Sequence, residues 1–132
     1  MRPEPVNLTK ILATFDETWS PRIIAQINEY DIRIAHVEGE HVWHVHEETD
    51  EFFLVLKGEF NILMRLGDRE ESVTLLEGDT YVVPKGIYHK PFSKEASILM
   101  FEPTGTSSTG DHYVGSLPKN IKNTTGYLLS RD

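Results

Sequence analysis

Residues 39–58 read GEHVWHVHEETDEFFLVLKG and decide the fold. The stretch is rich in valine, phenylalanine and leucine, which favour strands. Alternation along a strand would place His44 and His46 on one face, about 7 Å apart along the chain. A turn through residues 47–50 would then reverse the chain and bring Glu51 onto the neighbouring strand. The stretch therefore predicts two strands whose polar side chains point into one space.

The same strand pattern continues on both sides of this stretch. Short runs rich in Val, Ile, Phe and Tyr alternate with turn sequences such as Glu77-Gly78-Asp79 and Pro84-Lys85-Gly86. We expect strands at about 22–28, 31–38, 42–47, 50–57, 59–66, 70–76, 79–83, 87–92 and 96–102. No intervening segment is long enough for a crossover helix, so the strands should pair antiparallel. The pattern predicts an all-β barrel or double sheet.

The two ends of the chain have a different character. Residues 7–15 predict a short helix, with Asn7 as N-cap and an apolar stripe formed by Leu8, Ile11, Leu12 and Phe15. Residues 103–132 begin as a polar loop and continue with isolated apolar residues, so this tail can either dock on the barrel or be partly disordered. We expect one domain over residues 1–132, with its barrel core at about 22–102 and an irregular tail at 103–132.

Composition excludes several classes of protein. The chain has 132 residues, 39% of them hydrophobic and 26% charged, which is typical of a globular domain. It has no cysteine, so any metal must be held by His, Asp or Glu. The net charge is −8 and the basic residues are scattered, so no nucleic-acid partner is expected. No signal peptide and no long apolar run is evident, so we expect a cytoplasmic protein with no membrane partner.

Three histidines and one glutamate are the candidate metal ligands. His44, His46 and Glu51 lie within one short stretch, whereas His89 comes from a distant predicted strand. Such side chains suit one divalent transition metal ion, namely Fe, Mn, Ni, Co or Zn. Burying them without a partner would be costly, and a bound cation reverses that cost. The alternative is a set of solvated side chains or a metal-free polar pocket.

These residues also carry a family resemblance. Gly39 with His44-Val45-His46, Glu51 and Gly58 resembles the first cupin motif, and Gly78, Pro84, Gly86 and His89 resemble the second. The resemblance implies a small single-domain cupin of the conserved-barrel type, which is a double-stranded β-helix or jelly roll, over about residues 22–102. It also implies that His44, His46, Glu51 and His89 bind the metal, while the glycines and Pro84 serve turns. Two departures are a gap between Gly39 and His44 that is one residue short, and Ser93 in place of the usual asparagine.

Other polar residues have a plain structural interpretation beside a functional one. His36 has the same strand parity as Ile32 and Ile34. We expect a core histidine whose hydrogen bonds are satisfied, in preference to an inward-facing proton donor. His41 and His112 are expected at the surface. Arg33 and Lys90 can anchor a substrate carboxylate, although such side chains usually extend to solvent. Seven further residues can equally well line a pocket or belong to the core, namely Phe53, Phe60, Ile62, Met100, Tyr81, Tyr88 and Trp43.

The resulting hypothesis is a metal-dependent enzyme of the dioxygenase or isomerase type, acting on a small oxygen-rich substrate. Four protein ligands on an octahedral ion would leave two positions for water, dioxygen or substrate. No residue is singled out as catalytic beyond the ligands, and no organic cofactor is expected. The alternatives are a non-catalytic protein that binds or senses a small molecule or metal, and a purely structural ion.

Strand 50–57 is apolar on both faces. Glu51, Phe53 and Val55 share one parity, while Phe52, Leu54 and Leu56 form a second row. This second row should pack on the helix, on the tail or on another subunit. We therefore expect a homodimer.

Overall fold

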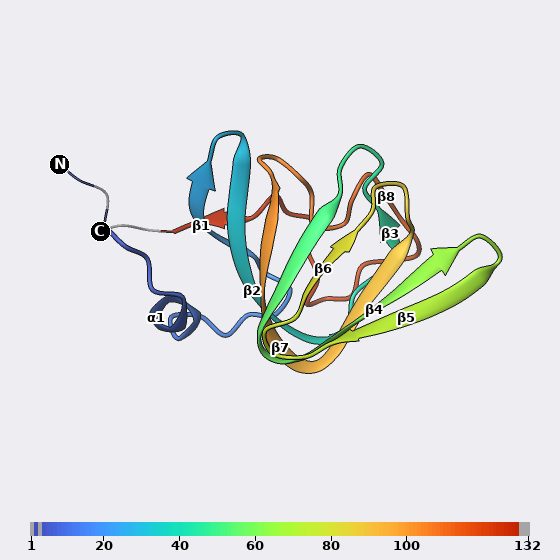
Figure 1. Cartoon of the computed structure of the whole chain (residues 1–132), viewed down its shortest axis with the longest axis horizontal. Coiled ribbons are helices and arrows are strands. Elements are labelled where there is room, and N and C mark those ends of the chain that lie inside the picture. The colour runs from blue at the N-terminus through green and yellow to red at the C-terminus, as the bar shows by residue number, and fades with distance from the viewer. Residues whose placement is uncertain (1, 3, 130–132) are drawn as a thin grey trace.

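The computed structural model describes residues 2 and 4–129. It confirms the all-β prediction: the chain forms a jelly roll whose barrel is open and not fully closed (Figure 1). The elements are α1 (Leu8–Leu12), β1 (Arg22–Ile27), β2 (Tyr30–Glu40), β3 (His44–Val45), β4 (Glu51–Leu66), β5 (Arg69–Leu75), β6 (Thr80–Val83), β7 (His89–Pro103), β8 (His112–Tyr113) and β9 (Tyr127–Leu128).

Pairing of the strands follows the order β5-β4-β7-β2-β1-β9, with β6 on β4, and with β3 between β7 and β8. The pairs are antiparallel except for β1 with β9, where Arg22 lies opposite Tyr127 in a parallel ladder. The expectation of purely antiparallel pairing is therefore wrong at this edge. The long tail brings β9 back alongside β1 in the same direction, so no crossover helix is needed.

Strands β4 and β7 are each continuous where the sequence predicted two strands. Gly58, expected in a turn, lies inside β4 with φ +85, between register shifts at Val55/Lys57 and Glu59/Asn61. A side chain there would collide with the carbonyl oxygen of Glu95 and come within 3.0 Å of the Ala96 Cα atom. Gly58 therefore permits a β-bulge that bends the strand, and it does not end the strand.

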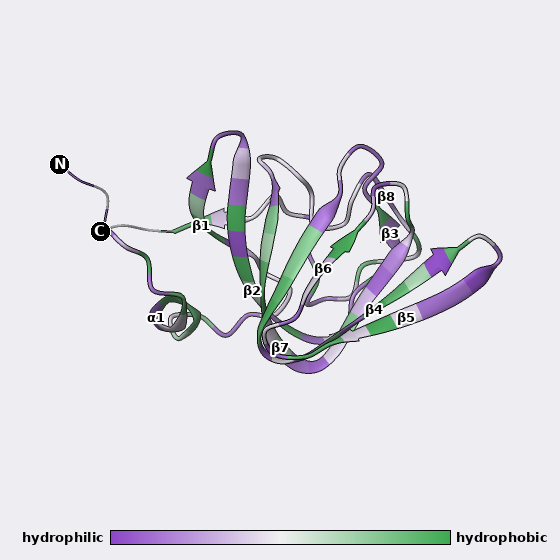
Figure 2. Cartoon of the chain, in the orientation of Figure 1, coloured by the Kyte–Doolittle hydropathy of each residue, from purple (hydrophilic) through white to green (hydrophobic). Residues whose placement is uncertain are grey.

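Alternate residues of the long strands build the core. Their inward side chains form one apolar cluster, which includes Phe53, Val55, Phe60, Ile62, Ile98 and Met100. Figure 2 shows long hydrophobic segments on β4 and β6, whereas the tip of the β4–β5 hairpin, which projects from the body, is hydrophilic. The site described below lies in the interior.

The ends of the chain pack on the barrel. Asn7 caps α1 by accepting a hydrogen bond of 2.9 Å from the backbone N–H of Lys10, as predicted, but the helix ends at Leu12 and has no buried residue. In the tail, Ile121 is 2% exposed and belongs to the core cluster. The tail docks on the barrel at β8, at Ile121 and at β9. Over the described residues, no helix has the length and apolarity needed to cross a membrane.

Candidate metal centre

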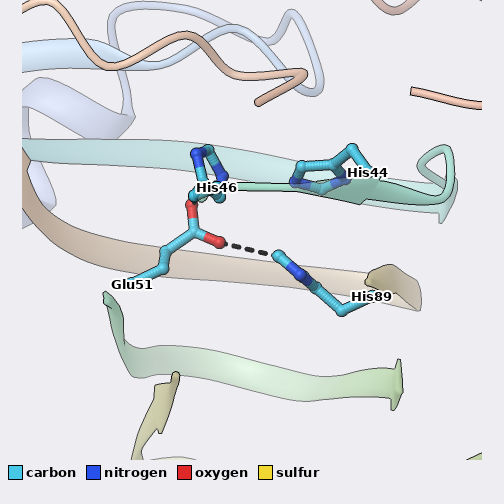
Figure 3. Close-up of side chains that lie close together, drawn as sticks. All are labelled: His44, His46, Glu51 and His89. Carbon is cyan, nitrogen blue, oxygen red and sulfur yellow. Dashed lines mark hydrogen bonds and ion pairs between the residues drawn. The ribbon is translucent and has the colours of Figure 1, made fainter. Parts of the chain in front are cut away.

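Four buried side chains meet inside the barrel (Figure 3). His44 in β3 lies directly opposite His89 in β7, His46 follows β3, and Glu51 begins β4. One potential ligand atom from each residue lies within 4.8 Å of those from the others. The geometry brings together all four residues that the sequence singled out, and they could hold a metal ion.

The route by which Glu51 reaches the site differs from the prediction. β3 does not form a hairpin with β4; in the described part of the chain it pairs with β7 and β8. The first residues of β4 pair instead with β6, where Glu51 lies opposite Val83. Glu51 therefore approaches the histidines from another part of the rolled sheet.

Backbone carbonyls orient two of the imidazole rings. The Nδ1 atom of His44 lies 2.8 Å from the carbonyl oxygen of Val42, and that of His89 lies 3.0 Å from the carbonyl oxygen of Ile87. A carbonyl oxygen only accepts hydrogen bonds, so these contacts assign the proton to Nδ1 in both rings. The Nε2 atoms are then left with lone pairs. This is the usual arrangement of a histidine that binds a metal.

The Nε2 atoms of His89 and His46 both face the Glu51 carboxylate. The Nε2 atom of His89 lies 3.0 Å from Glu51 Oε1, although its ring already donates through Nδ1. The buried Nε2 atom of His46 lies 3.4 Å from Glu51 Oε2 and has no hydrogen-bond partner. Lone pairs that face a carboxylate are stabilised by a proton or by a cation between them. The chemistry and placement of these donors fit a divalent metal.

Burial and neighbouring charges set the ionisation of the site. Burial would raise the pKa of Glu51, but the imidazoles of His46 and His89 hold that pKa well below its usual range. Burial and repulsion from His89 keep the pKa of His44 well below its ordinary value. For His46, the Glu51 carboxylate outweighs burial and raises the pKa. Glu51 is thus an anion, and His44 is neutral at pH 7 as a metal ligand must be.

Two loops fix the site from outside. The backbone N–H of Gly86 donates to the carbonyl oxygen of His46 over 2.8 Å. Asp111 accepts from the backbone N–H of Glu47 over 2.8 Å and donates its own N–H to Val45 over 2.8 Å. These bonds hold the segment that carries His44 and His46 between the barrel and the tail.

A cavity of about 40 Å³ adjoins the candidate ligands. Most of its walls are apolar. Phe53, Phe60 and Met100 line it, which agrees with the pocket-wall interpretation of these three residues. Ile62 belongs to the core and does not line the cavity. The polar lining includes His44 and Glu51 together with three residues without an assigned role, namely Arg33, His41 and Glu102. The cavity gives the candidate ligands a largely apolar neighbourhood.

Arg33 and His41 were expected to extend to solvent, and both expectations are wrong. Arg33 is 1% exposed, because its parity with Ala35 and Val37 turns it inward. His41 is buried against the rings of His44 and Trp19, and burial lowers its pKa to about 4. Arg33 has the opposite parity to Ile32 and Ile34, which we expected to face inward, so the pattern did not predict its burial; the burial of His41, which follows β2, was not predicted either.

Glu102 was missed in the sequence. It lies opposite Asp31 in the β2–β7 ladder and is 3% exposed. Burial and the neighbouring Glu51 carboxylate raise its pKa well above the ordinary value. Its alternation with Met100 was the available signal.

The remaining candidates are structural or peripheral. The ring of His36 is satisfied by Ser97 and by the carbonyl oxygens of Leu12 and Phe15, but His36 is half-buried and lies outside the core cluster, so it is not the core histidine that we expected. His112 is exposed, as expected, and Lys90 pairs with Glu40 over 2.8 Å.

The aromatic candidates lie at the edge of the core or outside it. The guanidinium of Arg65 stacks on Trp43, Tyr81 packs against the core, and Tyr88 is half-buried. Ser93, in place of the expected asparagine, donates to the carbonyl oxygen of Glu59.

Several known proteins are similar to this chain in sequence or in architecture. An uncharacterized protein of Bacillus subtilis, YdbB, is 36% identical over 84 residues, which cover 64% of this chain and 72% of that protein. The crystal structure of a cupin-2 domain protein from Shewanella frigidimarina is 43% identical with a TM-score of 0.69, covering 74% of this chain and 93% of the other. Protein NMB1881 of Neisseria meningitidis is 29% identical with a TM-score of 0.67, covering 76% and 99%.

A larger protein contains the same fold. Hydroquinone 1,2-dioxygenase of Sphingomonas sp. TTNP3, solved with 4-nitrophenol, is 25% identical with a TM-score of 0.68, but the match covers 76% of this chain and only 32% of that one. The family model described as the cupin domain matches residues 32–101, which hold all four candidate ligands. The chain therefore belongs to the cupin family.

Proposed function

We propose that the chain is a metal-dependent enzyme of the dioxygenase or isomerase type, in which His44, His46, Glu51 and His89 hold one divalent transition metal ion. The observation that carries this proposal is the contact of 3.0 Å between His89 Nε2 and Glu51 Oε1, where a proton or a cation has to lie between the two atoms. The orphaned Nε2 atom of His46 supports it independently. A metal bound here would supply a Lewis acid that polarises a substrate oxygen.

The chain's own residues would hold and shield the reacting group. The carbonyl oxygens of Val42 and Ile87 fix two imidazole rings, so the ligands need little rearrangement on binding. Phe53, Phe60 and Met100 would place apolar side chains beside the reacting group. Such a site suits chemistry at one substrate oxygen in a largely apolar environment. The likeness to hydroquinone 1,2-dioxygenase supports the dioxygenase class over the isomerase class.

The size of the cavity favours a second candidate function. A volume of about 40 Å³ has room for a few water-sized groups and not for a complete aromatic substrate. A protein that binds or senses a metal or small ligand without turnover needs no more space. The two functions share the metal site and differ in whether product forms.

Turnover by metal-loaded protein separates these two functions. We would purify the chain without a chelating tag, load it with Fe²⁺, Mn²⁺, Ni²⁺, Co²⁺ or Zn²⁺, and offer phenols including hydroquinone, diketones, keto acids and sugars. Oxygen uptake and product mass are the measurements. Turnover that Glu51→Gln abolishes and the exposed Glu59→Gln retains would support the enzyme. Metal bound at the four residues with no turnover on any substrate would favour the non-catalytic protein.

A further inference from the structure

Two buried side-chain nitrogen atoms lack a hydrogen-bond partner in the described part of the chain, His46 Nε2 and Arg33 Nε. The proposed metal accounts for the first. The second remains unexplained, because Arg33 is no part of the candidate ligand set. A buried donor without an acceptor costs about 1–3 kcal/mol, so an orphan of this kind indicates a missing partner.

The other nitrogens of Arg33 are engaged and fix the guanidinium in place. Nη1 donates to the carbonyl oxygen of Thr106 over 2.8 Å, and Nη2 donates to Asp31 Oδ2 over 3.0 Å, where both side chains are 1% exposed. The planar group therefore has no freedom to turn its Nε–H toward solvent. Its acceptor has to come to it.

Arg33 and the candidate ligand Glu51 line the same cavity. The cavity of about 40 Å³ also touches Phe53, Phe60 and Met100, and Ser108 of the tail borders it. A space of this size takes only a few water-sized groups, so an organic acid bound here would have to be a small one with a short chain. A phosphate would place further charged oxygens against the apolar walls, which is unfavourable.

We propose that the orphaned Nε–H of Arg33 binds the carboxylate of a short organic acid, whose apolar part lies in the cavity beside the metal ligands. The inference deepens the proposed function and rests on it for the identification of this acid as the substrate class. A cationic donor bonds a carboxylate more strongly than a neutral oxygen, which gives the site its preference. The competing occupant is a buried water molecule.

The ¹⁵N–¹H resonance of the Arg33 Nε–H group tests the proposal directly in wild-type protein. Propionate is the probe, and propionamide, which has nearly the same shape without the charge, is its control. We expect propionate to shift the resonance, and propionamide to bind roughly tenfold more weakly because it lacks the charge-assisted bond. A resonance that propionate does not move, or one that exchanges magnetisation only with water, would overturn the inference.

Two variants and a metal titration separate this result from the proposed function. Arg33→Lys keeps a positive charge beside Asp31 but loses the planar guanidinium and its Nε–H. Its affinity for propionate should therefore fall by roughly tenfold, whereas Lys90→Gln should retain the wild-type affinity. Titration with Zn²⁺, followed on the imidazole resonances of His44 and His89, reports the metal site separately. Zinc binding without a propionate shift would defeat only the inference. A propionate shift without zinc binding would support the acid site and defeat the metal proposal.

Discussion

At the scale of single residues, Glu51 is the group on which the interior depends. It is 5% exposed, and its two oxygens face His89 and His46. Its low pKa means that the carboxylate stays charged inside the barrel, where an unpaired anion would be costly. A cation bound by Glu51 would stabilise both the fold and the buried negative charge of the carboxylate.

Replacing Glu51 should therefore abolish tight metal binding. Glu51→Gln removes the only candidate anionic ligand, and we expect the affinity for Zn²⁺ or Ni²⁺ to fall by more than roughly tenfold, the loss that follows even when an indirect partner of a ligand is removed. Isothermal titration calorimetry measures it, with exposed Glu59→Gln as the matched control. Equal affinities in the two variants would contradict the assignment of Glu51.

Asp31, which is not one of the candidate ligands, gives the chain an acid-sensitive contribution to stability. Burial opposes its ionisation, but hydrogen bonds from Gln26, Thr104 and Arg33 hold its pKa below the ordinary 3.8. A carboxyl whose pKa is lowered by folding stabilises the chain above its unfolded pKa, and this stability is lost as the pH falls through the folded pKa.

The variant Asp31→Asn should be less stable than wild type by about 3–5 kcal/mol at pH 7, because it leaves the buried Arg33 charge uncompensated. We expect this difference to shrink as the pH falls below about 4. Urea unfolding at a series of pH values measures it. A difference that stays constant from pH 7 to pH 3 would show that the Asp31 carboxylate is not the source of the stability.

At the scale of elements, β3 is held in place by the tail. Gly110 has φ +67, and a side chain there would collide with the carbonyl oxygen of Val45 and lie 3.2 Å from His44 Cδ2. The tail thus touches the strand that carries a candidate ligand. Its backbone leaves no room for any residue other than glycine.

The variant Gly110→Ala should displace β3 and lower both stability and metal affinity. Gly105→Ala is the control, because Gly105 lies in the same tail with φ +89 and has nothing near its added Cβ. Both variants share a strain of about 1–2 kcal/mol from the left-handed backbone. Thermal unfolding and zinc titration should show a larger loss for Gly110→Ala. Matching losses would mean that the tail does not support the site.

The sequence predicts the strands better than their connections. Alternation and turn residues locate every long strand, but Gly58 is equally compatible with a turn and with a bulge, and only the contact with Glu95 in β7 decides between them. For the site, the spacing of His44 and His46 predicts a shared face. The meeting with His89 depends on long-range pairing, which local pattern does not encode and which only the family resemblance supplied.

At the scale of the whole molecule, the outer apolar row predicted for β4 is connected across strands. Phe52 lies opposite Phe101 on one side and Val82 on the other, and Leu54 lies opposite Leu99. These side chains are half-buried or exposed, and Val82 is 48% exposed. A connected apolar surface of this kind is typical of an interface between subunits.

The homodimer thus stays a prediction with a definite surface. Val82→Glu places a charge in the patch beside Phe52 and should convert a dimer into monomers, whereas Ser72→Glu on exposed β5 should not. Light scattering after size-exclusion chromatography gives the mass. A monomeric wild type, or a dimer that Val82→Glu leaves intact, would rule out this surface as the interface.

The central claim is that three imidazoles and one carboxylate bind a single divalent ion inside the rolled sheet. Anomalous scattering from crystals of protein purified without a chelating tag, together with elemental analysis of the same sample, tests it most directly. The account predicts one metal ion per chain, within bonding distance of His44, His46, Glu51 and His89. A metal-free chain after incubation with each candidate ion, or an ion bound elsewhere, would contradict it.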